Sequence, residues 1–526
     1  METIRVAPDC WSFAEASTGK RFVPFGANFV FDFPREEDGE MMRSLALMTE
    51  DIWRPRELEK AFEKARELHM NVMKVFLPLP QVLPDPQVNE YPVIRPMTPS
   101  LFERLDYLFK VAEETEIYVS LSLAEWGVHG LRWFHDGGAF FGAREPGQPD
   151  SYRILANFWE AIAGHCREKA ALFSYNLAVE FYLPSDNWGG VKGPGNGSVL
   201  FEDRFGSPAF HDWLSIRYTD VTEMNAKYGT RYASFSEVPI PDELSWNPYL
   251  EKYNVPRQFL IDYNDFRECV NYFFFKNQCD AIRRIDTRHM ITAGLHPDQI
   301  GMAPKGGGWK IGGINNREYD IFDYITIHLY TNLAYLIERP LLPPTFAEIV
   351  APFQTSKEEI ARRRRECLLY CRFIAGGRPV IVEEFGHASF DMEESYAETY
   401  KLLEELLGHV SGFMLWEYGH SYQDLKNSSG PIDEHLEICE WGKRWKTLNE
   451  PGGVIYDFPA QRLPARTVIR LDREEACAPV EETAGEMIMK NWDAYRHPVD
   501  FELEENPTLA LMKASGRRTV WNNPAK

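Results

Sequence analysis

Eight short apolar runs recur along this chain, and each is about as long as a β-strand. They are "RFVPFGANF" at 21–29, "NVMKVFLPL" at 71–79, "IYVSLSLAEWG" at 117–127, "LFSYNLAVEF" at 172–181, "HMITAGLH" at 289–296, "FDYITIHLY" at 322–330, "PVIVEEFG" at 379–386 and "GFMLWEYGH" at 412–420. A continuous apolar run, unlike an alternating one, indicates a strand that is buried on both faces. Such strands are typical of a parallel sheet that is covered by helices.

The segments between the runs carry helix patterns. In residues 98–116, Thr98 is a suitable N-cap, Pro99 falls in the first turn, and the apolar residues follow at helical spacing. Residues 54–69 and 356–375 have the same amphipathic period, and a further helix opens with a capping box at residues 391–394. Strands that alternate with helices predict the α/β class, and eight of them predict a closed (β/α)8 TIM barrel. A doubly wound sheet is the alternative, but no glycine-rich phosphate loop follows the first run.

Two stretches exceed a minimal barrel. Residues 185–255 form a long insertion after the fourth strand, and residues 451–526 form a C-terminal extension that we expect to pack on the barrel. The catalytic barrel would then cover residues 1–450, within the length that barrels with insertions reach.

Charge and cysteine usage narrow the partners and the location. The 79 acidic residues outnumber the 57 basic ones, giving a net charge of −22 and no basic patch for nucleic acid. No apolar run reaches 18 residues, so we expect no membrane span. The eight cysteines are scattered, and the first residues lack the pattern of a signal peptide. We therefore expect a cytoplasmic protein, and the sequence is compatible with a homo-oligomer.

Polar side chains gather where the runs end, and in a barrel of this kind the active site lies at the C-terminal ends of the strands. These side chains are Asn28, Lys74, Glu125, Trp126, His129, Glu180, His296, His328, Tyr330, Glu383, Glu384, Trp416 and Glu417. Unpaired carboxylates are costly to bury, so this cluster predicts a functional site. Two carboxylates across a barrel mouth can cleave a glycosidic bond, one as nucleophile and the other as proton donor.

The seventh run ends in two adjacent glutamates. Strict alternation would place Val380, Val382 and Glu384 on one face of the strand. Ile381 and Glu383 would then share the other face. We expect only one glutamate to point into the barrel mouth, and spacing alone leaves open which one.

Four of the runs resemble clan A glycoside hydrolases, which are retaining β-glycosidases on a (β/α)8 barrel. The motifs are "VEEFG" on strand seven, "YNLAVEF" on strand four, "IHLY" on strand six and "FMLWEYG" on strand eight. The resemblance implies that Glu180 is the acid/base and that Glu384, which precedes an aromatic residue and glycine, is the nucleophile. It implies that Tyr330 hydrogen-bonds the nucleophile and that Trp416 is a sugar platform. Glu383 is expected to be structural.

Residues of about 205–296 are similar to glycoside hydrolase family 42, the β-galactosidases, whereas strands two and four read equally like family 5. Two positions depart from the clan. Val179 stands where the clan has an asparagine that binds the sugar 2-hydroxyl, and Lys74 stands where it has an arginine. The further substrate-binding candidates are Lys74, Trp126, His129 and His328.

The sequence thus predicts a retaining β-glycoside hydrolase, first an exo-acting, β-galactosidase-like enzyme on oligosaccharides, with neither cofactor nor metal. One alternative is an endo-acting β-glucanase or mannanase of the family 5 type. Another is a non-catalytic carbohydrate-binding barrel, which the Val179 departure suggests. A weaker one is a metal-dependent hydrolase using His296 and His328.

Overall fold

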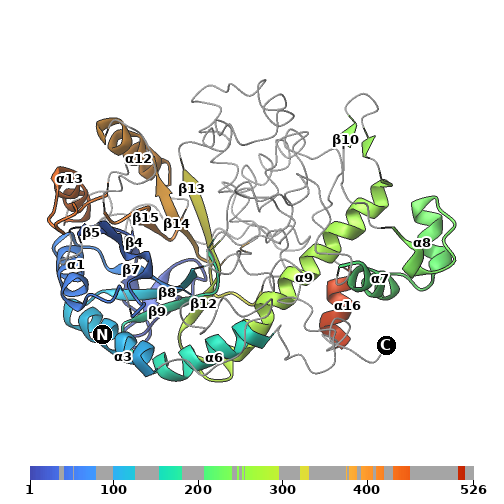
Figure 1. Cartoon of the computed structure of the whole chain (residues 1–526), viewed down its shortest axis with the longest axis horizontal. Helices are drawn as coiled ribbons and strands as arrows, with labels where there is room; N and C mark the ends of the chain where they lie inside the picture. Colours follow the sequence, from blue (N-terminus) through green and yellow to red (C-terminus); the bar gives the residue numbers. More distant parts are fainter. Residues whose placement is uncertain are drawn as a thin grey trace.

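A computed structural model gives the fold, with Figure 1 showing the whole chain and the described residues in colour. The described residues are 1–34, 39, 41–50, 52–78, 99–124, 153–179, 206–239, 246–247, 252–253, 255–294, 320–330, 375, 378–387, 392–406, 410–419, 430–450 and 507–515.

Eight parallel strands form the central sheet, in the order β12-β9-β8-β7-β4-β15-β14-β13. They are β4 (Phe25–Asn28), β7 (Val72–Pro78), β8 (Tyr118–Ala124), β9 (Leu172–Asn176), β12 (Met290–Thr292), β13 (Ile325–Tyr330), β14 (Val380–Gly386) and β15 (Gly412–Leu415). Each lies within one of the eight apolar runs. The two ends of the sheet meet, because Asp323 N donates to Ile291 O at 2.9 Å and Thr326 Oγ1 donates to Ala293 O at 2.7 Å. The barrel prediction is confirmed, and the doubly wound alternative is wrong.

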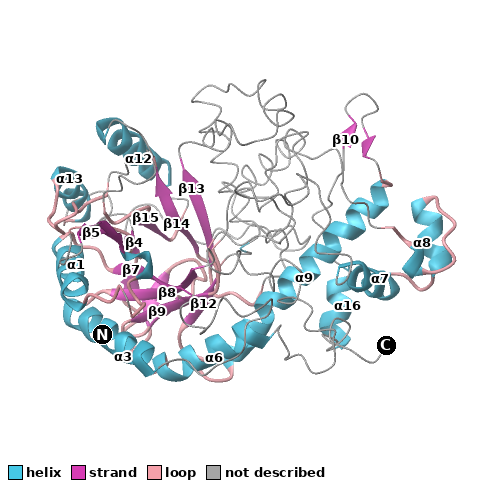
Figure 2. Ribbon diagram, viewed as in Figure 1, coloured by secondary structure: helices cyan, strands magenta, loops and turns pink. Residues whose placement is uncertain are grey.

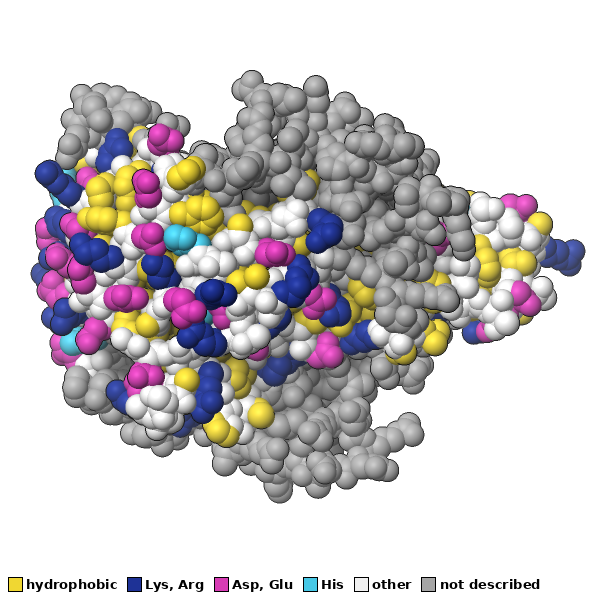
Figure 3. Space-filling view, turned by 90° about the horizontal axis from the view of Figure 1, so that it is seen from below, with side chains coloured by type: hydrophobic (Ala, Val, Ile, Leu, Met, Phe, Trp, Pro, Cys, Tyr) yellow, Lys and Arg dark blue, Asp and Glu magenta, His cyan; other side chains and the backbone are white. Residues whose placement is uncertain are grey.

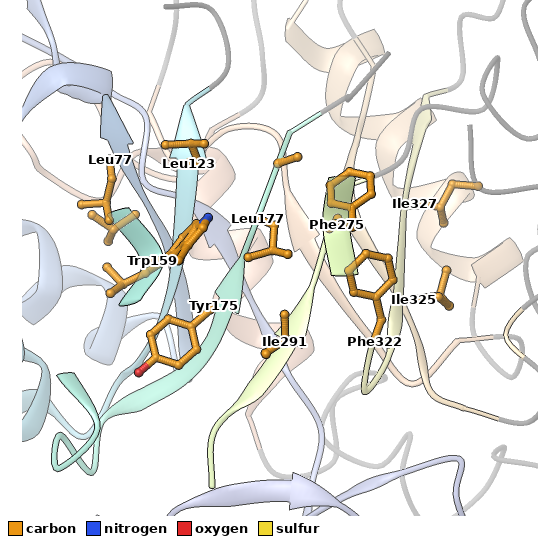
Figure 4. Packing of buried hydrophobic residues seen from close by; sticks show 14 of the residues in the cluster. Leu77, Leu123, Trp159, Tyr175, Leu177, Phe275, Ile291, Phe322, Ile325 and Ile327 are labelled. Atoms are coloured by element: carbon orange, nitrogen blue, oxygen red, sulfur yellow. The ribbon is translucent and has the colours of Figure 1, made fainter. Parts of the chain in front are cut away.

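Helices cover the outside of the barrel (Figure 2). They are α1 (Pro55–Glu67), α3 (Pro99–Thr115), α6 (Ile154–Cys166), α9 (Arg257–Arg283), α12 (Met392–Leu406) and α13 (Glu440–Asn449). Figure 4 shows Trp159 of α6 near Tyr175 on the outer face of the strands, with ring centroids 6.0 Å apart. The helices predicted over 54–69 and 98–116 are confirmed as α1 and α3, whereas the one predicted over 356–375 lies outside the described residues except for Ala375.

The described part of the segment between β9 and β12 contains three α-helices. They are α7 (Gly206–Arg217), α8 (Val221–Tyr228) and the long α9, with a hairpin of β10 (Trp246–Asn247) and β11 (Lys252–Tyr253) and the short η4 (Phe235–Glu237). Helix α16 (Pro507–Ser515) lies beside α7 and α9 (Figure 1), and Lys513 sits 4.5 Å from the centroid of the Tyr272 ring. The boundaries of the insertion and of the extension stay predictions.

A small antiparallel sheet closes the N-terminal end of the barrel. It consists of β1 (Ile4–Val6), β2 (Phe13–Glu15) and β3 (Arg21–Phe22). Its apolar side chains join an inner layer from the starts of the barrel strands, namely Ile4, Phe13, Val72, Tyr118, Phe173, Met290, Tyr324, Ile381 and Met414. The run 21–29 therefore holds two strands, and its interpretation as one was wrong. Only the second strand, β4, enters the barrel.

The described surface mixes charges of both signs, as Figure 3 shows for one face. Two further strands, β5 (Asp32–Pro34) and β6 (Met41–Arg43), form a separate hairpin. Among the described cysteines, Cys10, Cys166, Cys279 and Cys439 are free thiols, and Cys269 Sγ accepts a hydrogen bond from Trp213 Nε1 at 3.3 Å. Among the described helices, none combines the length and the apolar character that crossing a membrane requires.

Asp286 anchors the turn that leads from α9 into β12. Its buried carboxylate accepts from Tyr175 Oη at 2.8 Å and contacts His289 Nδ1 at 2.7 Å. Burial alone would raise the pKa of Asp286, but the hydrogen bonds and the charge of His289 bring it below its usual value. The stabilisation is therefore present above the unfolded-state pKa of about 3.9 and fades as the pH falls further below that value.

We expect Asp286→Asn to lower the free energy of unfolding in urea by about 3 kcal/mol at pH 7, because a buried charged acceptor is lost. The difference from the wild type should shrink below about pH 3. Asp280→Asn is the control, since its pair with Lys276 at 2.8 Å is exposed and should contribute less than about 1 kcal/mol. Equal losses in the two variants would contradict this account.

Candidate active site

A bulge in β14 turns both glutamates of "VEEFG" toward the barrel interior. Val382 pairs with Ile327 of β13, yet the next pair is His328 with Glu384, so the register shifts by one residue at Glu383. A second shift on the β15 side lies between Val382 and Phe385. The expectation that only one glutamate points inward was wrong, because the extra residue of a bulge breaks the two-residue alternation.

Among the described side chains, three surround Glu384: two from the adjacent strand β13 and one from β7. Tyr330 Oη donates to Glu384 Oε2 at 2.5 Å, and His328 Nδ1 lies 3.2 Å from the same oxygen. Lys74 Nζ lies 3.7 Å from Oε1. The Glu384 side chain is 4 % exposed, so these contacts are made in a nearly dry environment where charge interactions are strong.

Glu383 is fully buried and shares two of these partners. Its Oε2 lies 3.0 Å from Lys74 Nζ and 3.5 Å from His328 Nε2, while Oε1 accepts from Asn176 Nδ2. Burial alone would raise the pKa of Glu383, but Lys74 and His328 more than offset it and hold the pKa below its usual value. Glu383 is therefore an ionised member of the cluster.

Two asparagines support the glutamates: Asn28, which belongs to the predicted strand-end cluster, and Asn176, which was not predicted. Asn28 Nδ2 donates to Glu383 O at 2.9 Å and to Leu415 O at 3.1 Å, which ties the bulge of β14 to β15. Asn176 reaches the Glu383 carboxylate from β9. Its signal was an amide in the middle of the apolar run 172–181, since a buried amide needs a partner.

Among the described residues of the barrel mouth, a group of apolar side chains lies beside the carboxylates. Val179, Val30 and Phe76 form a small buried cluster, and the partly buried Trp416 packs against it. The Val179 side chain cannot donate a hydrogen bond, unlike the asparagine that the clan has at this position. Glu417, next to Trp416, turns to Arg43 Nη2 at 2.6 Å.

The structure brings together five of the eight predicted site residues or places them at the same mouth. Glu384 is contacted by Lys74, His328 and Tyr330. Trp416 follows β15 at the same mouth. Lys74 lies inside β7, not at its end, because that strand extends to Pro78. Glu180, Trp126 and His129 lie outside the described residues, as do Glu125 and His296.

The geometry suits a carboxylate that attacks and is then expelled. An ionised Glu384 offers one oxygen that is fixed by Tyr330 and His328, and another that is near Lys74. Fixed donors and a fixed cation around a carboxylate cost no reorganisation during a reaction.

We expect Tyr330→Phe to reduce kcat about 10- to 100-fold on any glycoside that the chain cleaves, because one preorganised donor is lost. The donor favours the ionised carboxylate, so its loss should move the acidic limb of the kcat/KM profile to higher pH. Tyr400→Phe on the outer helix α12 is the control. An unchanged profile in Tyr330→Phe would argue against the Tyr330–Glu384 contact.

The model of glycoside hydrolase family 42, described as beta-galactosidase, matches residues 203–317. The resemblance to this family is confirmed over that segment, which contains α7, α8, α9 and β12. The segment is less than a quarter of the chain and includes neither Glu180 nor Glu384. No curated protein matches the chain.

Solved structures of glycoside hydrolases share the fold at low sequence identity. A beta-galactosidase from the haloarchaeon Halorubrum lacusprofundi has a TM-score of 0.53 and 14 % identity, covering 83 % of this chain and 58 % of its own. A family 42 beta-galactosidase from G. stearothermophilus has a TM-score of 0.52 and 15 % identity over 81 % and 57 %. An exo-beta-1,4-mannosidase from Opitutaceae bacterium strain TAV5 has a TM-score of 0.50 and 14 % identity over 93 % and 71 %. The chain thus spans less than two thirds of the two beta-galactosidases.

Proposed function

We propose that this chain is a retaining β-glycoside hydrolase in which Glu384 is the nucleophile and Glu180 the acid/base. The observation that carries the proposal is the inward-facing Glu384, which accepts a hydrogen bond from Tyr330 and lies beside Lys74 and His328. The family match over 203–317 and the barrel that the chain shares with beta-galactosidases and a beta-mannosidase support it.

The reaction would run in two displacements. Glu384 attacks the anomeric carbon, and the glycosidic bond breaks as Glu180 protonates the leaving oxygen. Glu180, now ionised, takes a proton from water, whose oxygen attacks the same carbon and releases the sugar and the Glu384 carboxylate. Two inversions leave the β-configuration unchanged. Lys74 and the hydroxyl of Tyr330 would hold the carboxylate in line for both steps.

The first candidate substrate is a β-galactoside, cleaved from the end of an oligosaccharide, as the family match suggests. The second is a β-mannoside, which a specific feature favours. Val179 packs against Val30 and Phe76 and offers no donor to an equatorial 2-hydroxyl, whereas mannosides carry this hydroxyl on the axial side. A cytoplasmic location and self-association remain predictions from the sequence.

The test is hydrolysis of aryl β-glycosides of galactose, mannose, glucose, xylose, fucose and arabinose by the full chain. We expect turnover of one sugar far above the others, with the β-anomer as the first product by NMR. Release of the α-anomer would contradict the double displacement.

Three further arms separate the alternatives. Cleavage of long glucans or mannans without hydrolysis of any aryl glycoside would favour the endo-acting enzyme. Binding of oligosaccharides without cleavage would favour the non-catalytic barrel. Loss of activity in EDTA would favour the metal-dependent hydrolase.

A further inference from the structure

The two carboxylates and two nitrogen bases at the centre of the barrel form a closed ring of contacts. Lys74 Nζ lies 3.0 Å from Glu383 and 3.7 Å from Glu384. His328 bridges the same pair, because Nε2 lies 3.5 Å from Glu383 Oε2 and Nδ1 lies 3.2 Å from Glu384 Oε2. Lys74 is thus nearer to the glutamate that the proposed reaction does not use.

Four features of the fold accommodate the Glu383 side chain in the barrel interior. The bulge of β14 turns its side chain inward, and Asn28 fixes the bulged backbone through Glu383 O. Asn176 donates to the carboxylate from β9. A Cβ on Gly294 would lie 3.1 Å from Glu383 Oε2 and 2.8 Å from Ala178 O, so a larger side chain at this position would crowd the carboxylate. Glu383 therefore occupies a site that several strands build.

The charges around the pair come from three different strands. β7 contributes Lys74, β13 contributes His328 and Tyr330, and Glu417 after β15 is paired with Arg43. A second carboxylate this close to Glu384 would normally favour protonation of one of the two. Lys74 and His328 offset that repulsion, and Glu383 in return neutralises positive charge that would otherwise act on Glu384 alone.

We propose that Glu383 is a positioning residue of the reaction: it holds Lys74 and His328 against the nucleophile and takes up part of their charge. This inference rests on the proposed function and adds a second glutamate to it. A carboxylate that is fully paired with a buried cation is a weaker nucleophile and a poorer base. By sharing Lys74, Glu383 keeps Glu384 reactive while still ionised at neutral pH.

The test compares the pH dependence of kcat/KM for the wild type, Glu383→Gln and Glu113→Gln on the preferred aryl glycoside. Glu113 is an exposed residue of α3, so its change is the control for the loss of one carboxylate. In Glu383→Gln, Glu384 loses a neighbouring negative charge. Lys74 then acts on Glu384 alone, so Glu384 binds a proton less readily. We expect the acidic limb to move to lower pH by about one unit and kcat to fall about 10- to 100-fold.

The direction in which the acidic limb of kcat/KM moves distinguishes a positioning role of Glu383 from a structural one. A purely structural role for Glu383 would lower kcat and thermal stability with no movement of the limb, and that result would overturn the inference. Movement to higher pH would also overturn it. A wild type without activity on any glycoside would instead refute the proposed function, so the two failures are distinct.

A double variant keeps the inference testable if Glu383→Gln does not fold. Lys74→Met alone removes the cation and leaves Glu383 to repel Glu384, which should move the acidic limb to higher pH. Lys74→Met with Glu383→Gln removes both charges, and the limb should return toward the wild-type position. A double variant with the same limb as Lys74→Met would show that Glu383 has no charge effect on the nucleophile.

Discussion

Replacing Glu384 with glutamine should lower kcat about 10⁵-fold on the preferred glycoside, the scale of loss seen when a nucleophile is removed. Glutamine keeps the volume of the side chain but has no negative oxygen to attack the anomeric carbon. KM should change little, because the proposed sugar platform Trp416 and the apolar cluster beside it are unchanged. Initial rates at saturating aryl glycoside give the result, with Glu113→Gln as the control.

A variant with a smaller side chain sharpens this prediction. In Glu384→Ala, azide can enter the space of the carboxylate, attack the anomeric carbon and expel the phenolate in one displacement. The expected product is the α-glycosyl azide, identified by NMR. Full activity in Glu384→Gln with loss in Glu383→Gln would mean that the neighbouring glutamate is the nucleophile.

Glu180→Ala should cause a loss that depends on the leaving group. Without the proton donor, glycosides with sugar or alkyl leaving groups should be cleaved about 10³-fold more slowly. A dinitrophenyl glycoside needs little protonation, so its first displacement should be nearly unaffected. The second displacement should slow, because no base activates water, and the glycosyl-enzyme should accumulate.

Burst kinetics with dinitrophenyl glycosides measure this effect in Glu180→Ala. Azide should relieve the slow step by attacking the glycosyl-enzyme, and here the product should be the β-glycosyl azide. Glu160→Ala on the outer face of α6 is a control, since its pair with Arg284 is exposed. An equal loss for all leaving groups would contradict the acid/base role of Glu180.

The barrel could be predicted from the sequence because its signals are local. Each buried strand is a continuous apolar run, and each of the eight runs contains one barrel strand. The split of run 21–29 was missed, since the apolar pattern continues through Val23 and Pro24 while the chain passes from the small sheet into the barrel. Pairing with β2, not composition, separates β3 from β4.

The site was less accessible to sequence reasoning, since it depends on the register between strands. Alternation predicted that only one of the two glutamates points inward, which was wrong, because the bulge at Glu383 arises from how β14 pairs with β13 and β15. The contact of Tyr330 with Glu384 was expected from the clan resemblance. The sharing of Lys74 by both glutamates was not, as no local pattern reports which residues of different strands meet inside the barrel.

Trapping of the covalent intermediate identifies the nucleophile on the wild-type chain. The wild type would be inactivated with the dinitrophenyl 2-deoxy-2-fluoro-β-glycoside of the preferred sugar, digested and mapped by mass spectrometry. The account predicts one fluorosugar per chain, attached to Glu384. A label on Glu383, or steady hydrolysis of substrate by a chain that never accumulates a label, would contradict it.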